Sequence, residues 1–223
     1  MGQLVEFPSN GHQCQGWFAA PPSGKGPAVV VIQEWWGLVP HVQDLVERFA
    51  KEGFVAIAPD LYHGKTTKSP DEAGKMLMEL DVERAEREIA GAGDYVLARP
   101  ECSSKKFGVV GFCMGGALAQ YEATKNASKV GAAVSFYGGF KNVSTDWEEL
   151  QAPILFIFGE KDQGVPPNPQ LAEKLREQGK LAEAIVYPNA GHAFFNDARP
   201  EAYNAEAAAD AWQRTIELFH ETL

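Results

Sequence analysis

One cysteine of this chain lies in a setting that suits a nucleophile. Cys113 is framed by Gly111, Gly115 and Gly116, and the apolar segment 107–110 comes just before them. Flanking glycines allow a strained turn between a strand and a closely packed helix, and such a turn exposes the side chain at the strand end. The pattern therefore predicts a nucleophile elbow with a thiol in place of the commoner serine hydroxyl, and covalent catalysis is the first hypothesis.

Three further reactive side chains come shortly after predicted strands. They are Asp162, His192 and Glu34. Ligands of mostly parallel sheets gather beyond the carboxyl ends of the strands, so we expect these three groups to meet Cys113 there. The order nucleophile, acid, histidine along the chain is that of the α/β-hydrolases.

The residue types suggest a role for each group. A thiol is only a few per cent ionised at neutral pH, and His192 is the base that would raise its reactive fraction. Asp162 would hold the imidazole in the right tautomer and favour its charged form, although Glu160, two residues earlier, is an alternative acid. The backbone N–H groups of Met114 and Trp35 are predicted to bind the developing oxyanion.

Strands and helices must alternate along the chain to bring these residues together. An Asn-Gly turn at 9–12 predicts an antiparallel hairpin. Further strands are predicted at 28–32, 54–58, 107–110, 132–136, 154–158 and 184–187, with helices around 42–49, 71–80 and 82–98 and after Gly115, Pro169 and Asn204. The mixed charges at 81–88 indicate a solvated helix face. We predict one α/β domain over residues 1–223 with an α/β-hydrolase fold: a mostly parallel central sheet, an antiparallel N-terminal hairpin and helices on both faces.

Charge and composition argue against several functional classes. The formal net charge of -10 would repel nucleic acid and anionic lipid. No segment reaches the roughly 18 apolar residues of a membrane span, and no secretory signal is recognisable. The three cysteines show no Cys-x-x-Cys spacing, and the histidines show no metal-ligand spacing. We expect a cytoplasmic protein without metal, cofactor, nucleic-acid or membrane partner; a monomer is compatible with the sequence, which leaves the oligomeric state open.

Five segments together resemble the dienelactone hydrolase family of α/β-hydrolases, in the order of that family. The matching segments are 33–37, 58–62, 111–116, 158–162 and 191–194. The resemblance implies a cysteine nucleophile and a glutamate, here Glu34, that interacts with the thiol in the resting enzyme and helps to take its proton when substrate arrives. Independently, the two tryptophans beside Glu34 would desolvate it partly and raise its proton affinity.

The chain departs from the family pattern in its basic residues. The founding enzymes bind a substrate carboxylate through arginines, one of them four residues after the histidine, where this chain has Asn196. The insertion that carries the other arginine is missing here. Arg84, Arg199 and Lys65 are the candidates to compensate, so the substrate is less well defined than the mechanism.

We therefore predict a hydrolase of small esters or lactones, with enol lactones of the dienelactone type first, that acts through a thioester acyl-enzyme. Trp36, Tyr62, Tyr137 and Phe194 are predicted to line the substrate pocket, although aromatic residues near strand ends are also common in cores. Peptides are poor candidates because an amine leaves less readily than the thiolate. The alternatives are a broader carboxylesterase or thioesterase, a non-catalytic ligand-binding protein on the same fold, and a redox protein that uses Cys113 alone.

Overall fold

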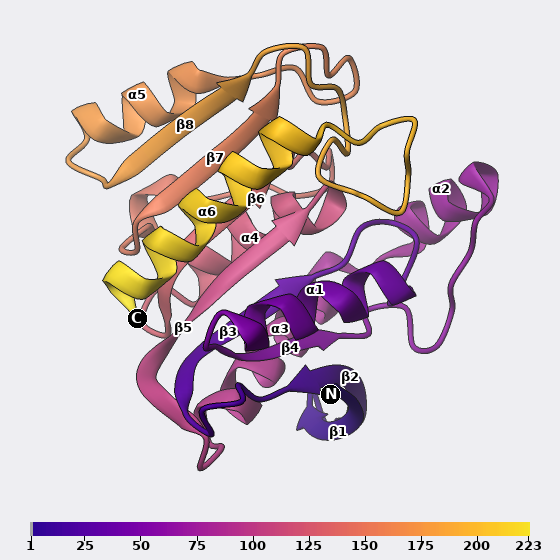
Figure 1. Ribbon diagram of the computed structural model, residues 1–223, viewed down its shortest axis with the longest axis vertical. Helices are drawn as coiled ribbons and strands as arrows, with labels where there is room; N and C mark the ends of the chain where they lie inside the picture. The colour runs from indigo at the N-terminus through magenta and orange to yellow at the C-terminus, as the bar shows by residue number, and fades with distance from the viewer. Residues whose placement is uncertain (1) are drawn as a thin grey trace.

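The computed structural model describes residues 2–223, so residue 1 of the predicted domain lies outside it. The described residues form an eight-stranded sheet in the order β1-β2-β4-β3-β5-β6-β7-β8 (Figure 1). The strands are β1 (Gln3–Ser9), β2 (His12–Ala19), β3 (Gly26–Ile32), β4 (Val55–Pro59), β5 (Cys102–Phe112), β6 (Val130–Phe136), β7 (Ile154–Gly159) and β8 (Ala182–Tyr187). The helices are α1 (Pro40–Lys51), α2 (Pro70–Glu79), α3 (Val82–Leu97), α4 (Met114–Lys125), α5 (Pro169–Glu177) and α6 (Ala205–Thr222), with a 3-10 turn η1 (Trp147–Glu149).

The antiparallel part of the sheet is confined to its N-terminal edge. β1 and β2 form the predicted hairpin, in which Ser9 pairs with His12 across the turn. Asn10 and Gly11 both have positive φ, 54° and 76°, as a two-residue turn that follows the twist of its strands requires. β2 then pairs antiparallel with β4, and every later pairing in the sheet is parallel. The predicted fold is confirmed.

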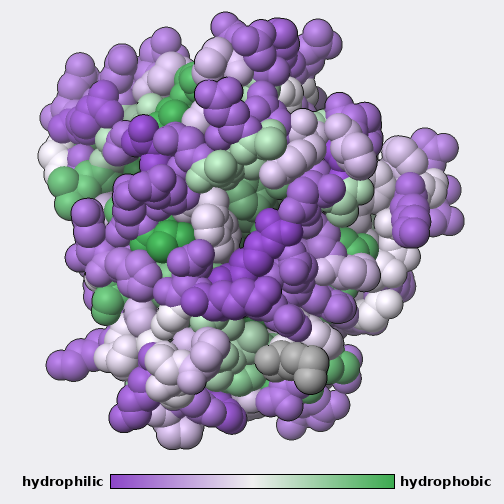
Figure 2. Space-filling view, viewed as in Figure 1, coloured by the Kyte–Doolittle hydropathy of each residue, from purple (hydrophilic) through white to green (hydrophobic). Residues whose placement is uncertain are grey.

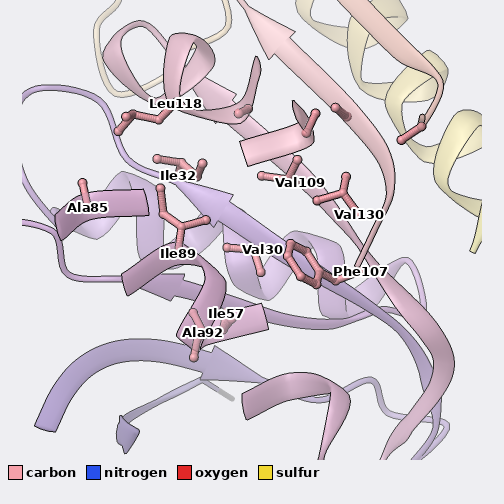
Figure 3. Close-up of a cluster of buried hydrophobic side chains, with 14 of the residues drawn as sticks. Val30, Ile32, Ile57, Ala85, Ile89, Ala92, Phe107, Val109, Leu118 and Val130 are labelled. Atoms are coloured by element: carbon pink, nitrogen blue, oxygen red, sulfur yellow. The ribbon is translucent and has the colours of Figure 1, made fainter. Parts of the chain in front are cut away.

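Helices cover both faces of the sheet, which explains why its central strands lack polar alternation. Val30 and Ile32 of β3 pack in one buried cluster with Ile89 of α3 and Leu118 of α4 (Figure 3). The intervening side chains of β3 pack in a second cluster, with α1 and α6 on the opposite face. A strand buried on both faces needs an apolar residue at every position, and residues 28–32 of β3 are fully buried.

The parallel strands carry the loops that hold the candidate site. β5, β7 and β8 end on the same side of the molecule, where the 188–204 loop joins β8 to α6 (Figure 1). The surface seen in Figure 2 is mostly hydrophilic, and the apolar residues on it form separate small patches. Among residues 2–223, no helix has both the length and the apolar character needed to cross a membrane.

Candidate active site

The turn at Cys113 has the sharp geometry that its glycines predicted. Cys113 joins β5 to α4. Its backbone has φ 56° and ψ −117°, a conformation that residues other than glycine rarely adopt. Its N–H donates to the carbonyl of Phe136 at 3.0 Å, which ties the turn to the end of β6. A Cβ atom at Gly111 would overlap the carbonyl of Gly115, so the strand and the helix can approach this closely only without a side chain there. The thiol is consequently held at the carboxyl end of the sheet.

His192 and Asp162 are in contact. His192 Nδ1 and Asp162 Oδ2 are 2.6 Å apart. The other Asp162 oxygen accepts hydrogen bonds from the N–H groups of Gly164 at 2.9 Å and Val165 at 2.8 Å, which fix the carboxylate. Glu160, the alternative acid, instead accepts a hydrogen bond from the N–H of Asn189. Of the two acids, only Asp162 can therefore orient the imidazole in this arrangement.

The thiol of Cys113 also acts on the imidazole of His192. Burial lowers the pKa of His192, but its hydrogen bonds with Asp162 and Cys113, together with their charges, outweigh burial and raise the pKa to about 10. An imidazolium between a carboxylate and a sulfur stabilises the thiolate, the form of cysteine that attacks carbonyl carbon.

Glu34 is buried within electrostatic reach of His192, and it is hydrogen-bonded to Asn196, a partner that the sequence did not indicate. Its Oε2 atom accepts a hydrogen bond from Asn196 Nδ2 at 2.7 Å, and only 4% of Glu34 is exposed. Asn196 Oδ1 in turn accepts the N–H of Ala198 at 3.1 Å, so the amide must present its nitrogen to Glu34. Burial raises the pKa of Glu34 against the opposing effects of Asn196, His192, Arg199 and Tyr137.

Neither carboxylate oxygen of Glu34 is hydrogen-bonded to the thiol, and the interaction that the family resemblance implied stays a prediction. Oε2 is bound to Asn196, and Oε1 has no hydrogen-bond partner among the described residues. Asn196, the residue that departs from the family pattern, therefore holds the Glu34 carboxyl group in place. Sequence inspection marked Asn196 as a difference but offered no signal for this pairing, because the partners are 162 positions apart.

The two predicted oxyanion donors lie at the start of α4 and after β3. Met114 is the first residue of α4, where a backbone N–H has no acceptor within the helix. Trp35 follows Glu34 in the turn after β3, and its ring contacts Trp36 with centroids 5.0 Å apart. Their role as donors to an oxyanion stays a prediction.

Of the four aromatic residues predicted to bind substrate, Trp36 lines a cavity. This cavity of about 440 Å³ is also lined by His41, Asn196 and Arg199, and the Arg199 guanidinium lies 5.7 Å from the centre of the Trp36 ring. Tyr62, Tyr137 and Phe194 are buried in the two hydrophobic clusters, as in the core interpretation that the sequence left open. Substrate contact by any of the four stays a prediction.

The three basic residues considered as substitutes for the missing arginines lie in different places. Arg199 is in the cavity beside Trp36, where its charge reaches Glu34 and its Nε also contacts Glu201 at 3.0 Å. Arg84 lies on α3 beside Glu88, and Lys65 lines a separate groove between the loop after β4 and α2. Arg199 is the one of the three whose position suits an anion near Glu34.

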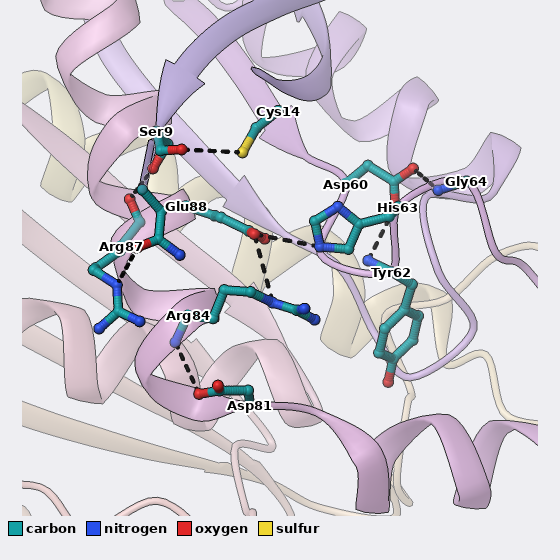
Figure 4. Close-up of polar contacts among 11 residues, drawn as sticks. Ser9, Cys14, Asp60, Tyr62, His63, Gly64, Asp81, Arg84, Arg87 and Glu88 are labelled. Carbon is teal, nitrogen blue, oxygen red and sulfur yellow. Dashed lines mark hydrogen bonds and ion pairs between the residues drawn. The ribbon is translucent and has the colours of Figure 1, made fainter. Parts of the chain in front are cut away.

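A second polar cluster supports the turn that carries Tyr62. Asp60 accepts the N–H groups of Tyr62 at 3.1 Å and Gly64 at 2.6 Å, and His63 Nε2 lies 3.3 Å from Glu88 Oε1 of α3 (Figure 4). Glu88 is 3% exposed, and burial raises its pKa to about 7. The prediction of a solvated helix face at 81–88 is wrong at this position, because the turn after β4 covers Glu88.

Tyr62 extends from this turn toward Met114 at the start of α4. Its side chain points away from the polar cluster in Figure 4. The hydroxyl contacts Met114 Sδ at 3.3 Å. Burial, with the charge of Cys113 as a lesser cause, raises the pKa of Tyr62 beyond its ordinary range. The turn after β4 therefore connects α3 with the start of α4.

Fold and site together define a hydrolase of the α/β-hydrolase fold, and comparison with known proteins identifies the family. A sequence model described as "Dienelactone hydrolase family" matches residues 14–223. The chain belongs to this family. It is 41% identical to "Protein usf" of Aquifex pyrophilus over the full length of both chains. It is 36% identical to a "Putative carboxymethylenebutenolidase" of Aquifex aeolicus, over 98% of each chain.

A solved structure also has this fold. The crystal structure titled "Putative Dienelactone Hydrolase" from Klebsiella pneumoniae has a TM-score of 0.88 and 30% sequence identity to this chain. The match covers 99% of this chain and 98% of that one, so the two chains share the whole arrangement of strands and helices.

Proposed function

We propose that this protein hydrolyses small carboxylic esters or lactones, with enol lactones first, through a thioester formed on Cys113. The observation that carries the proposal is the 2.6 Å contact between Asp162 and His192, a histidine whose pKa is raised by Asp162 and Cys113 together. The names of the family and of its relatives favour a lactone as substrate. The protein would act in the cytoplasm as one domain, without a cofactor or a membrane or nucleic-acid partner.

Acylation begins at the sulfur. The Cys113 thiolate attacks the carbonyl carbon, and the carbonyl oxygen becomes an oxyanion that the N–H groups of Met114 and Trp35 would bind. Collapse of this intermediate breaks the bond to the leaving oxygen, which takes the proton of the His192 imidazolium and leaves His192 neutral. When the substrate is a lactone, the leaving oxygen remains attached to the acyl group. An enolate is a better leaving group than a simple alkoxide or an amine, so an enol lactone suits this nucleophile.

Deacylation needs a base for water. His192, held by Asp162, takes a proton from water while the water oxygen attacks the thioester carbonyl. The C–S bond then breaks, which releases the acid and restores the thiolate–imidazolium pair. The hydrogen bonds from Gly164 and Val165 support this step because they keep Asp162 fixed as the histidine charges.

Intact-protein mass spectrometry tests the proposal directly. The protein is mixed with an enol lactone, p-nitrophenyl acetate or an acyl thioester, and the acyl mass is read in wild type, Cys113→Ala and Cys102→Ala. Cys102→Ala is the matched control because it removes a partly exposed cysteine from the other end of β5. We expect an acyl adduct in the wild type and in the control and none in Cys113→Ala.

The substrate panel separates the alternatives. Turnover of the enol lactone supports the first substrate class. Turnover of the other two substrates alone replaces it with a broader carboxylesterase or thioesterase. No adduct and no turnover with any substrate would contradict the catalytic proposal and favour a ligand-binding protein.

A further inference from the structure

Asp197 connects the 188–204 loop to α1. Its Oδ2 atom accepts a hydrogen bond from Arg48 Nη2, and its Oδ1 atom lies 3.3 Å from His41 Nδ1. Arg48 is oriented by a second acid of the helix, because its Nε donates to Asp44 Oδ2 at 2.5 Å. His41 and Arg48 are about two helical turns apart and therefore lie on one face of α1. Both oxygens of the Asp197 carboxylate thus contact the same face of this helix.

These contacts lie directly beside the hydrogen bond that holds Glu34. Asp197 follows Asn196 in the chain, and α1 begins six residues after Glu34. The 188–204 loop and the segment after β3 are therefore joined at two adjacent points. The first is the buried hydrogen bond between Asn196 and Glu34 at 2.7 Å, and the second is the ion pair of Asp197 with Arg48, whose side chains are 33% and 35% exposed. Loss of the second contact would free the backbone on one side of Asn196.

The segment that leads to Asp197 needs a restraint at this end. Ala193, next to the histidine, has a φ of 59°, which is strained for a residue other than glycine. Two turns follow, in which the N–H of Asn196 donates to the Ala193 carbonyl at 2.9 Å and the N–H of Arg199 donates to the Asn196 carbonyl at 3.0 Å. Asn196 ends a run of four buried residues, and Asp197 is the first exposed one. Hydrogen bonds within the turns set their shape, whereas the contacts of Asp197 set their position against α1.

We propose that Asp197 is a positioning residue, which holds the Asn196 amide against Glu34 through its contacts with α1. A buried carboxyl group that loses this hydrogen bond must turn toward water or take up a proton. Either change alters the charge near His192, the base of the proposed mechanism. The inference rests on the proposed function, because its kinetic consequence is measured as acylation of Cys113.

Acylation kinetics test the positioning role. The burst of p-nitrophenol from p-nitrophenyl acetate is followed by stopped flow at a series of ester concentrations in wild type, Asp197→Ala, Asn196→Ala and the double variant. Small displacements near reacting atoms are costly, so Asp197→Ala should lower the limiting acylation rate at least about 10-fold. The half-saturating ester concentration should stay within about twofold, because Asp197 is not among the described residues that line the cavity beside Trp36. The double variant should be no slower than Asn196→Ala, because both changes break one connection.

Hydrogen exchange gives a second readout, which does not depend on activity. The backbone N–H groups of Asn196 and Arg199 should exchange at least about 10-fold faster in Asp197→Ala than in the wild type, and those of β6 should be unchanged. Arg48→Met breaks the same contact from the side of α1 and should reproduce both effects.

A matched control removes an ion pair of similar exposure elsewhere. Asp94→Ala deletes the carboxylate that Lys129 contacts at 2.6 Å on α3, and it should acylate like the wild type. Exposed ion pairs contribute little to global stability, so Asp94→Ala and Asp197→Ala should both unfold within about 4 °C of the wild type.

Several outcomes would overturn the positioning role of Asp197. They are acylation by Asp197→Ala within twofold of wild type, slower acylation without faster exchange at Asn196, and effects of the Asp197 and Asn196 changes that multiply. A rise in the half-saturating concentration that accounts for the slower acylation would assign Asp197 to binding instead, and a larger loss of thermal stability would assign it to the fold. A wild type without any burst contradicts the proposed function, and the exchange measurement then still tests the link between Asp197 and Asn196.

Discussion

At the scale of single residues, the proposed nucleophile Cys113 has a backbone conformation that is unfavourable for a residue with a side chain. Cys113 has a φ of 56°, and a residue with a side chain in such a region costs of order 1–3 kcal/mol. The hydrogen bond to Phe136 and the close packing of Gly111 against Gly115 hold the turn in place. Stability is given up here to expose the sulfur at the strand end.

Replacing the cysteine with glycine should reverse that loss. We expect Cys113→Gly to raise the free energy of unfolding by about 1 kcal/mol relative to Cys113→Ala, because glycine adopts positive φ without steric strain. Urea unfolding of the two variants measures the difference. Both variants lack the thiol, so the difference in their stability reports the backbone strain that a Cβ atom causes at this position. Equal stability of the two variants would show that no strain is stored at this turn.

Residue types predicted the candidate site better than they predicted its contacts. The motif around Cys113 and the strand-end positions of Asp162 and His192 were readable from the chain, because local turns fix where such residues lie. The anchoring of Glu34 by Asn196 was not readable, since it depends on how the loop after β8 meets the end of β3.

At the scale of elements, the turn after β4 and helix α3 depend on each other. Glu88 of α3 is buried under this turn, where it faces His63 and Arg84. The sequence pattern predicted a helix at 82–98, close to the bounds of α3. The charged residues at its start were interpreted as a solvent-exposed face. Burial of Glu88 arises from tertiary packing, which helical periodicity alone does not reveal.

The unfolding of the protein should report the titration of Glu88. Burial raises its pKa from 4.5 to about 7, and Arg84, Asp60, Arg87 and Asp81 modify that shift. Because the folded-state pKa is raised, the stability linked to Glu88 is fully present below pH 4.5 and is lost as the pH rises through 7.

Glu88→Gln removes this titration. The stability of the wild type relative to Glu88→Gln should therefore fall as the pH rises from about 4.5 to about 7, by no more than about 3 kcal/mol. Chemical unfolding at a series of pH values measures it. Glu83→Gln is the matched control, because Glu83 lies on the same helix with 70% of its side chain exposed, and it should show no such trend. A flat difference between wild type and Glu88→Gln would contradict burial of this carboxyl group.

At the scale of the whole molecule, α6 closes one face of the sheet. Phe219 of α6 is fully buried, and its ring lies 6.1 Å from Phe49 of α1 and 6.1 Å from Phe54, which precedes β4. The layered arrangement was predictable, because alternating strands and helices with apolar runs have few ways to bury their surfaces. The packing partners of α6 could not be predicted. Amphipathic periodicity indicates which side of a helix is buried, but it does not indicate which residues pack against that side.

Loss of the Phe219 ring should weaken the fold and leave the site intact. We expect Phe219→Ala to lower the free energy of unfolding by about 3–5 kcal/mol, through lost contacts and the resulting cavity. Glu221→Ala, an exposed change in the same turn of α6, should be neutral. Urea unfolding measures both, and the acylation rate per folded molecule should match that of the wild type. A loss below about 1 kcal/mol would contradict the packing role of this ring.

The separation of the site residues along the chain bears on how the protein is made. Cys113 is synthesised before Asp162 and His192. Glu34 is synthesised 162 residues before its partner Asn196. A nascent chain therefore carries a thiol with no imidazole to ionise it. If His192 activates Cys113 as proposed, that activation requires β8 to have joined the sheet, because His192 follows β8 in the chain.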